Sequence, residues 1–329
     1  MSKTKKKLRI GVLTTGGDCP GLNAAIRAVT RTSIYYGHEV IGFLRGYEGL
    51  IENQYLLMNS HSVSNILQRG GTILKTARSE RFKTVEGRAI AAENLKGHNL
   101  DALVVIGGDG SFKGIETFTR EHPMRVVGIP KTIDNDIYGT DYAIGYDTAL
   151  NTVVQAVDKI RDTADSHDRL FFVEVMGRDA GMIALLSGIG SGAEAILIPE
   201  SKTRVEQIIH ILKRGWNRKK TSMIVLVAEG DDAGGAYKIA QEVKSRFSHF
   251  DTRVSVLGHM QRGGSPSCSD RVLASRLGVA AVEALIEGRS NEMVGVVNNQ
   301  IVHTPFPVVV NSKKEFPMEL MRIAEILSL

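Results

Sequence analysis

Residues 8–23, with the sequence LRIGVLTTGGDCPGLN, join an apolar run to a helical segment through a glycine-rich turn. The run Leu8–Leu13 does not alternate between apolar and polar residues, which is typical of a strand buried on both faces of a parallel sheet. The segment Leu22–Tyr36 spaces its apolar residues as a helix does. A buried strand followed directly by a helix predicts the first unit of an α/β fold.

The alternation of strands and helices continues along the chain. Further strands are predicted at Glu39–Leu44, Asp101–Ile106, Arg125–Ile129, Leu170–Met176, Ala195–Ile198, Ser222–Ala228 and Arg253–Leu257. Further helices are predicted at Ser111–Glu121, Gly145–Thr163, Val205–Trp216, Gly235–Phe247 and Asp270–Glu287. These strands are too many for one comfortable sheet, so we expect two doubly wound, Rossmann-like domains with mainly parallel sheets covered by helices on both faces. The chain is expected to leave the first sheet in the loop 130–142.

The composition of the 329-residue chain argues against a membrane span and against a nucleic-acid partner. No apolar run approaches the roughly 18 residues that cross a bilayer. The net charge of +5 comes from five basic residues among the first nine, because the rest of the chain holds 36 basic and 36 acidic residues. We expect this basic start to be a solvated tail on a neutral, aromatic-poor body. Cys19 and Cys268 form no CxxC pair, so the cytoplasm is the expected compartment.

Two glycine-rich turns follow predicted strands and begin predicted helices. The first is Thr14–Asn23, and the second is GGDGS, residues 107–111. Each is either a phosphate-binding loop, in which glycine lets backbone N–H groups approach an anion, or a tight turn that needs glycine for its dihedral angles. Neither turn matches GxGxxG or GxxxxGK[ST], which disfavours dehydrogenases and P-loop kinases.

Acidic residues in two of the strand-end segments indicate a metal and a catalytic base. Asp109 lies among the glycines of the second turn, where a carboxylate would repel a phosphate unless a divalent cation such as Mg²⁺ lay between them. The alternative role for Asp109 is to cap the N-terminus of the helix that follows. The segment PKTIDND, residues 130–136, places Asp134 and Asp136 beside Lys131. One of two close carboxylates can hold a metal while the other takes a proton. We expect the chemical centre in this segment.

Basic residues gather at other expected strand ends, namely Arg169, Arg178, Arg253, His259 and Arg262. Arginine binds phosphate through two parallel hydrogen bonds, so the group as a whole indicates an anionic substrate. Any one of these arginines alone is more simply explained by a surface ion pair.

Five strings, GGDCPGLNAAIR, GGDGS, PKTIDND, EVMGRDAG and GHMQRGG, occur in the order found in 6-phosphofructokinases. The chain resembles this family from Ile10 to about His303. The resemblance implies a glycolytic enzyme that transfers a phosphoryl group from a nucleotide to the 1-hydroxyl of fructose 6-phosphate, giving fructose 1,6-bisphosphate. It also implies a homotetramer, a nucleotide-binding domain at 1–138 plus about 257–303, and a sugar-phosphate-binding domain at 139–256 plus about 304–329.

The resemblance also assigns roles to individual residues. Asp134 matches the catalytic base of the family, and Asp109 and Asp136 match the acids that hold Mg²⁺. Gly17, Thr132 and Arg178 match the groups that stabilise charge on the transferred phosphoryl group. Nucleotide contacts are matched by Gly17, Arg78, Asp109, Gly110, Ser111, Gly114 and Lys131. Contacts to the sugar phosphate are matched by Thr132, Asp134, Met176, Gly177, Arg178, Glu229, His259 and Arg262, and by Arg169 and Arg253. Similar enzymes supply the last two from a neighbouring subunit, so shared active sites are expected.

Two departures from the family pattern concern the donor and regulation. Lys131 replaces the glycine of many bacterial ATP-dependent members and is typical of pyrophosphate-dependent ones. Gly110 stands where the pyrophosphate-dependent type usually carries aspartate, whose carboxylate would repel the α-phosphate of a nucleotide. Plant and trypanosomal ATP-dependent relatives combine the same Gly and Lys. ATP is therefore the favoured donor.

The allosteric site for nucleotides and phosphoenolpyruvate of bacterial relatives is matched by Arg27, Arg31, Arg161, Gly192, Glu194, Arg218 and Lys220. Ser60 replaces an arginine usual there, which weakens the expected anion binding.

Three other functions remain open from the sequence. A pyrophosphate-dependent phosphotransferase acting on the same sugar is the main one. A non-catalytic sugar-phosphate sensor would be marked by loss of Asp134 or Asp109, and both acids are present. A sugar-binding transcriptional regulator is disfavoured by the neutral body and by the lack of a helix-turn-helix segment.

Overall fold

The computed structural model describes residues 7–328, so Lys3, Lys5 and Lys6 of the expected solvated tail lie outside the described residues. The chain folds into two compact units. Within the described residues, unit 1 comprises 7–132, 136–145 and 262–314, and unit 2 comprises 133–135, 146–261 and 315–328. The bounds differ from the predicted domains at residues 133–135, 139–145, 257–261 and 304–314. The chain turns back into unit 1 after residue 135 and leaves it again only after residue 145.

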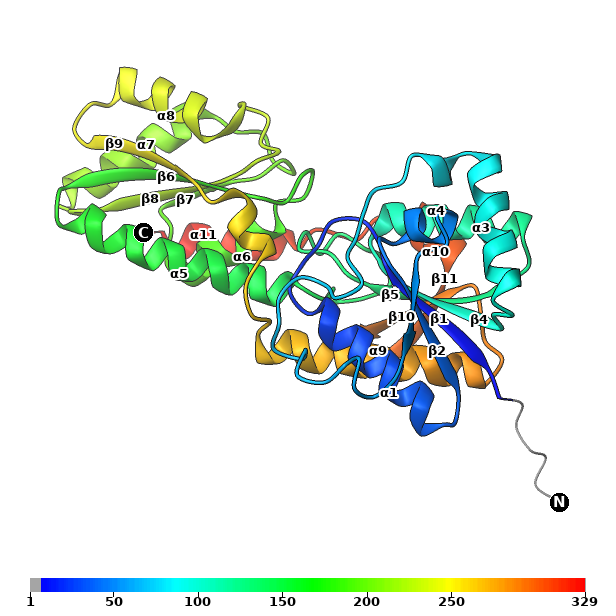
Figure 1. Ribbon diagram of the computed structural model, residues 1–329. Coiled ribbons are helices and arrows are strands. Elements are labelled where there is room, and N and C mark those ends of the chain that lie inside the picture. Colours follow the sequence, from blue (N-terminus) through cyan, green and yellow to red (C-terminus); the bar gives the residue numbers. More distant parts are fainter. Residues whose placement is uncertain (1–6, 329) are drawn as a thin grey trace. The chain divides into compact units, whose positions relative to one another are not determined.

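Unit 1 is built on a seven-stranded sheet with the order β11-β10-β5-β4-β1-β2-β3 (Figure 1). Its strands are β1 (Arg9–Thr14), β2 (Glu39–Phe43), β3 (Tyr55–Met58), β4 (Ala102–Gly107), β5 (Arg125–Pro130), β10 (Glu292–Val297) and β11 (Gln300–Pro305). All neighbours run parallel except at the two edges, where β3 and β11 are antiparallel to β2 and β10. The prediction of a mainly parallel sheet is confirmed.

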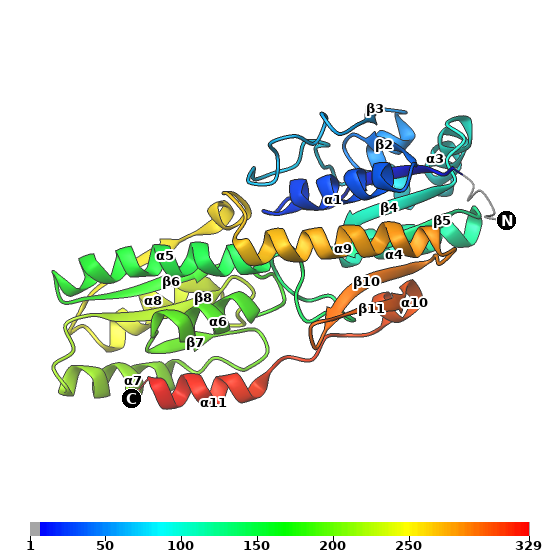
Figure 2. The same ribbon diagram turned by 90° about the horizontal axis from the view of Figure 1, so that it is seen from below.

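Helices cover both faces of this sheet. One face carries α1 (Leu22–Tyr35) and α9 (Cys268–Ile286), which lie side by side (Figure 2). The other face carries α2 (Tyr47–Ile51), η1 (Arg81–Lys83), α3 (Val85–Gly97), α4 (Asp109–Glu121) and α10 (Phe306–Asn311). Phe112, Phe118 and Phe306 are fully buried in the core on that second face, where each large side chain contributes about 1.5–3 kcal/mol by leaving water. With both faces covered, the loops at the strand ends are the parts of the sheet that remain available to a ligand.

The order of the strands reverses beside β1. From β1 the chain proceeds to β2 and β3 on one side, whereas β4 lies on the other side of β1 and is followed by β5. Thr14 pairs with Ile106 and Gly107 with Pro130, so the loops after these three strands begin at the same edge. Open α/β sheets bind ligands at such a reversal, outside the carboxyl ends of the strands.

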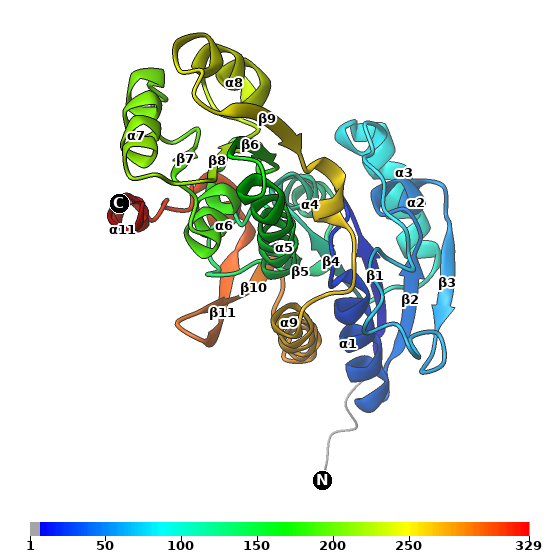
Figure 3. The same cartoon turned by 90° about the vertical axis from the view of Figure 1, so that its left-hand side faces the viewer.

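Unit 2 is built on a four-stranded parallel sheet with the order β7-β8-β6-β9. Its strands are β6 (Arg169–Val175), β7 (Ala195–Leu197), β8 (Met223–Ala228) and β9 (Asp251–Val256), followed by the short helix η2 (Gly258–Arg262). One face is covered by α7 (Val205–Asn217) and α8 (Gly235–Arg246), and the other by α5 (Tyr146–Asp165) and α6 (Met182–Ser191) (Figure 3). The C-terminal helix α11 (Met318–Leu327) lies against α6 and β7. Among residues 7–328, no helix is both long and apolar enough to cross a membrane.

Candidate active site

The glycine-rich turn after β1 is held through its carbonyl groups. Gly16 has a left-handed backbone with a φ of 85°, and its carbonyl accepts a hydrogen bond from Thr76 Oγ1 at 2.7 Å. The carbonyl of Gly17 accepts a hydrogen bond from the buried ammonium of Lys131, and that of Asp18 accepts one from Arg262 Nη1 at 3.2 Å. Within residues 7–328, the N–H of Gly17 has no acceptor. A turn fixed by its carbonyls with a spare N–H is the arrangement that anion binding requires.

The second glycine-rich turn follows β4 and begins α4. It starts at the carboxyl end of the strand next to β1, and so beside the first turn. The N–H groups of Ser111 and Phe112 donate to the carbonyl of Gly108 at 2.9 and 3.0 Å, which fixes the first turn of the helix. Gly108 is the N-cap, and Asp109 pairs with Lys113 at 2.7 Å instead of capping the helix. The alternative explanation of Asp109 as a helix cap is therefore not what the structure shows. A side chain at Gly110 would meet no atom within 4 Å, so space is open beside this turn.

The segment after β5 extends the pairing of this strand with β4 by one residue. Lys131 donates its N–H to the carbonyl of Gly107 at 2.9 Å, and Thr132 donates to Ile144 at 3.2 Å. Asn135 then adopts a left-handed backbone with a φ of 52°, which asparagine tolerates better than most residues. Asp134 is buried, with 5% exposure, while Asp136 is exposed. The two acids of this segment therefore lie in different environments, as a division between proton transfer and metal binding requires.

In unit 2, the loop after β6 is fixed by the end of the neighbouring strand. Glu229 Oε1 accepts hydrogen bonds from the N–H groups of Gly177 at 3.3 Å and Arg178 at 2.8 Å. Arg178 has a left-handed φ of 52°, which costs a non-glycine residue about 1–3 kcal/mol and is typical of functional loops. Gln261 Oε1 accepts from the N–H of Met176 at 3.2 Å. The predicted substrate residues Met176, Gly177, Arg178 and Glu229 thus form one connected group.

Arg169 and Arg253 lie on the adjacent strands β6 and β9 and share one partner. Both bind Asp251 Oδ2, at 3.1 Å from Arg169 and 2.7 Å from Arg253. Desolvation acts to raise the pKa of Asp251, but the hydrogen bonds from the two arginines outweigh it and leave this pKa below its ordinary value. The two guanidinium groups are thus gathered around Asp251 of the edge strand β9, and His259, in η2, is exposed.

The residues of the predicted effector site fall into both units. In unit 2, Arg161 Nη2 donates to the carbonyls of Ser191 and Gly192 at 2.7 and 3.0 Å. Glu194 is buried and accepts hydrogen bonds from Lys220 Nζ at 3.2 Å and from the N–H of Ile224 at 2.6 Å.

In unit 1, Arg27 and Arg31 lie one turn apart on α1. Burial, and then the neighbouring charge of Arg31, lower the pKa of the Arg27 guanidinium. Two cations that repel each other would be stabilised by a bound anion.

The carboxylates predicted to hold a metal fit Mg²⁺ by their chemistry. No group of three or more His, Cys, Asp or Glu side chains forms a metal-binding cluster within the part of the chain that is described. Mg²⁺ usually keeps several waters and takes only one or two carboxylates besides the phosphates of a substrate. Asp109, whose side chain is 42% exposed, and the exposed Asp136 offer oxygen ligands of that kind.

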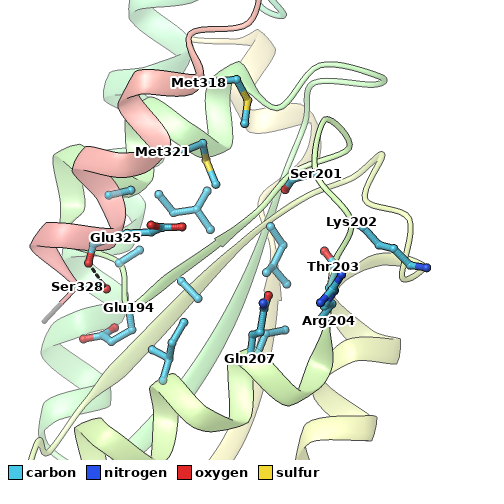
Figure 4. Close-up of a pocket in the computed structure, with 17 residues that line it drawn as sticks. Glu194, Ser201, Lys202, Thr203, Arg204, Gln207, Met318, Met321, Glu325 and Ser328 are labelled. Atoms are coloured by element: carbon cyan, nitrogen blue, oxygen red, sulfur yellow. Dashed lines mark hydrogen bonds between the residues drawn. The ribbon is translucent and has the colours of Figure 1, made fainter.

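A separate cavity of about 280 Å³ lies within unit 2, between β7, the start of α7 and α11. Met318, Met321 and Glu325 reach into it from α11, opposite Gln207 of α7 (Figure 4). Of the predicted site residues, Glu194 alone lines this cavity. The predicted catalytic and substrate residues therefore do not belong to it.

Residues 9–285 match the Phosphofructokinase family. The chain belongs to this family. It is 54% identical to "ATP-dependent 6-phosphofructokinase 2" of Bacteroides thetaiotaomicron over 97% of this chain and 98% of that protein. It is 51% identical to "ATP-dependent 6-phosphofructokinase 1" of Thermus thermophilus over 98% of this chain and 99% of that one.

A solved structure of phosphofructokinase from Saccharomyces cerevisiae superposes with a TM-score of 0.89 at 36% identity. The alignment covers 98% of this chain and 48% of the yeast chain, so this phosphofructokinase spans about half the length of that relative. The family and the α/β fold expected from the sequence are confirmed.

Three residues that fix the site were not among the predicted ones. Thr76 and Asp251 lie outside the recognised strings, and nothing in the local sequence marks them. Gln261 lies inside GHMQRGG, so the string itself was the available signal. All three act by holding a neighbouring loop or side chain.

Proposed function

We propose that this phosphofructokinase transfers the terminal phosphoryl group of ATP to the 1-hydroxyl of fructose 6-phosphate, giving fructose 1,6-bisphosphate and ADP in glycolysis. The observation that carries the proposal is the reversal of strand order beside β1, which brings the turns containing Gly17 and Asp109 and the loop containing Lys131 to one edge of the sheet. The names of the relatives at 54% and 51% identity support ATP as the donor.

In the proposed reaction, the 1-hydroxyl oxygen attacks the terminal phosphorus, the bond from that phosphorus to the oxygen of ADP breaks, and Asp134 takes the hydroxyl proton. Burial of Asp134 keeps water from competing for this position. The free N–H of Gly17, the hydroxyl of Thr132 and the guanidinium of Arg178 are assigned to the charge that develops on the transferred group. Mg²⁺, held by Asp109 and Asp136, would neutralise part of the phosphate charge when bound.

The nucleotide is assigned to Arg78, Asp109, Gly110, Ser111, Gly114 and Lys131, together with Gly17. Open space beside Gly110 supports this assignment, because a nucleotide needs room for an α-phosphate that pyrophosphate lacks. The sugar phosphate is assigned to the group around Met176, Gly177, Arg178 and Glu229, with Thr132, His259 and Arg262. Pyrophosphate remains the alternative donor because of Lys131.

We further propose that the enzyme is a cytoplasmic homotetramer in which Arg169 and Arg253 serve the active site of a neighbouring subunit. Support comes from the exposure of Arg253 on the edge strand β9, where another chain can approach it. The effector residues, from Arg27 to Lys220, are proposed to bind ADP or phosphoenolpyruvate weakly, because Ser60 supplies no cation. An activity that responds to neither compound would reject this regulatory role.

The test compares wild type with Asp134→Asn, using ATP and pyrophosphate at a fixed concentration of fructose 6-phosphate. We expect wild type to turn over with ATP, and Asp134→Asn to lose about 10²- to 10⁴-fold in kcat with little change in the KM for either substrate. Turnover with pyrophosphate alone would replace the donor in the proposal. Near-normal kcat for Asp134→Asn would remove this residue from its role, and absence of turnover in wild type would favour a sensor.

A further inference from the structure

The stretch that follows the proposed catalytic segment is fastened to β10 of the unit 1 sheet and to the turn that follows this strand. Asp141 donates its N–H to the carbonyl of Val296 at 2.7 Å, and its Oδ2 accepts the N–H of Asn298 at 2.8 Å. Thr140 Oγ1 accepts the N–H of Val296 at 3.1 Å. These bonds fix the far end of a short run that begins at Asp136, so the geometry at Asp141 limits where Asp136 can move.

Lys314 adds a contact from the opposite end of the chain. Its Nζ donates to the carbonyl of Asp141 at 2.7 Å, across 173 residues of sequence. Lys314 is the last residue of unit 1, and Glu315 begins the final segment of unit 2. The side chain therefore ties the catalytic stretch to the point where the chain finally leaves this unit.

The surroundings of Lys314 differ from those of an ordinary surface lysine. Burial lowers the pKa of its ammonium to about 8, although the nearby carboxylates of Asp141 and Asp136 act in the opposite direction. Lysine is rarely buried without a partner, because removing its charge from water is costly. The adjacent Lys313 is exposed, so the environment belongs to this position and not to the whole segment.

We propose that Lys314 is a positioning residue for phosphoryl transfer, whose ammonium holds the carbonyl of Asp141 and so fixes the stretch that carries Asp136. The proposal rests on the function proposed above for Asp134 and Asp136. A displacement of about 1 Å at a reacting group can cost about 100-fold in rate, so an anchor five residues away can affect turnover without touching a substrate.

The experiment compares Lys314→Met and Lys314→Arg with the matched control Lys313→Met. We expect complete loss of the anchor to lower kcat by about tenfold or more, because a small displacement of a reacting group slows the reaction steeply. We expect the KM values for ATP and fructose 6-phosphate to change by less than about threefold, because Lys314 touches neither proposed binding group. Lys314→Arg keeps the charge and a donor and should recover most of kcat, while Lys313→Met should match wild type.

Hydrogen exchange supplies a readout that does not depend on activity. Amides of residues 136–145 should exchange faster in Lys314→Met than in wild type or Lys313→Met. Unchanged exchange, or faster exchange with normal kcat, would overturn the positioning role. If Lys314→Met fails to fold, a Lys314→Arg enzyme with wild-type exchange but a tenfold lower kcat would equally overturn it.

A parallel Asp136→Asn variant separates failure of this inference from failure of the proposed site. Inactive Asp136→Asn together with fully active Lys314→Met would overturn the inference about Lys314 alone. Fully active Asp136→Asn would overturn the role of the segment on which the inference depends. Loss of kcat in both variants, with faster exchange only in Lys314→Met, is the expected result.

Discussion

The ammonium of Lys131 is buried and donates a hydrogen bond to the carbonyl of Gly17, which joins the loop after β5 to the glycine-rich turn after β1. Lys131 is also held through its backbone, because its N–H donates to Gly107 of the neighbouring strand at 2.9 Å. Its position is therefore set by the strand, and the side chain in turn sets the position of the turn. This contact gives Lys131 a structural role that is compatible with either phosphoryl donor.

Removing this contact should weaken the use of the donor. In Lys131→Met the carbonyl of Gly17 loses a charged donor worth about 1.5–3 kcal/mol, so kcat/KM for ATP should fall by about 10- to 150-fold. The KM for fructose 6-phosphate should change little. Steady-state kinetics at varied ATP would measure this, with the exposed Lys96→Met as control. A Lys131→Met enzyme with wild-type kcat/KM for ATP would contradict the proposed function of the contact.

Gly110 allows a test of donor selection by charge. Because a Cβ at this position meets no atom within 4 Å, Gly110→Ala should retain activity with ATP. Gly110→Asp adds a carboxylate at the proposed place of the α-phosphate and should lower kcat/KM for ATP by at least about tenfold, while any use of pyrophosphate should fall much less. Gly110→Asn has nearly the same shape without the charge. An equal loss in the Asn and Asp variants would show that size, and not repulsion, is responsible.

The strand-and-helix framework could be predicted from sequence because buried parallel strands leave a local signal. The runs at Leu8–Leu13 and Asp101–Ile106 differ from the observed β1 and β4 by about one residue at each end. The edge strand β3 was not predicted, because its exposed residues Tyr55, Leu56 and Leu57 lack the buried pattern. The other edge strand, β11, and the buried inner strand β10 were not predicted either, so periodicity identified most, but not all, of the strands that are buried on both faces.

The assignment of site residues could be predicted from the ordered strings, whereas the contacts that fix them could not. No local pattern shows that Glu229 holds the left-handed Arg178, or that Thr76 holds Gly16, because these partners are far apart in sequence. The domain boundary predicted near residue 304 differs from the observed one for the same reason, because the contacts that hold the following segment join residues far apart in sequence. The segment 304–314 stays in unit 1, where Phe306 is buried in the core and Lys314 binds the carbonyl of Asp141.

The shared active site can be tested by mixing two inactive variants. Subunits carrying Asp134→Asn and subunits carrying Arg169→Ala should each be strongly impaired alone. If Arg169 serves a neighbouring subunit, a hybrid places an intact Asp134 opposite an intact Arg169 in some sites, and an equal mixture should regain about a quarter of wild-type activity. Co-expression with two different affinity tags, followed by activity assays of purified hybrids, would measure this. A hybrid activity equal to the mean of the two parents would instead place Arg169 in its own subunit's site.

Cys19 makes a prediction about stability at high pH. It lies within the glycine-rich turn, and its fully buried thiol donates to the carbonyl of Ile144 at 3.3 Å. Burial is the main reason that the pKa of this thiol rises from 9.0 to about 12, with smaller opposing effects of nearby charges including Lys131. Above about pH 9 the unfolded chain therefore loses the thiol proton while the folded chain keeps it. Because the unfolded state then binds fewer protons, the free energy of unfolding must fall as pH rises towards 12.

The magnitude follows from about 1.4 kcal/mol for each unit of pH, so Cys19 should remove about 2 kcal/mol of stability between about pH 9 and pH 10.5. Urea unfolding of wild type, Cys19→Ala and the exposed-site control Cys268→Ala at these pH values isolates the effect, because other groups titrate equally in all three proteins. Cys19→Ala should be less stable at pH 8 but should lose less stability on going to pH 10.5. Parallel losses in wild type and Cys19→Ala would mean that the thiol ionises in the folded protein as readily as in the unfolded chain, and that the fold does not shield it from solvent.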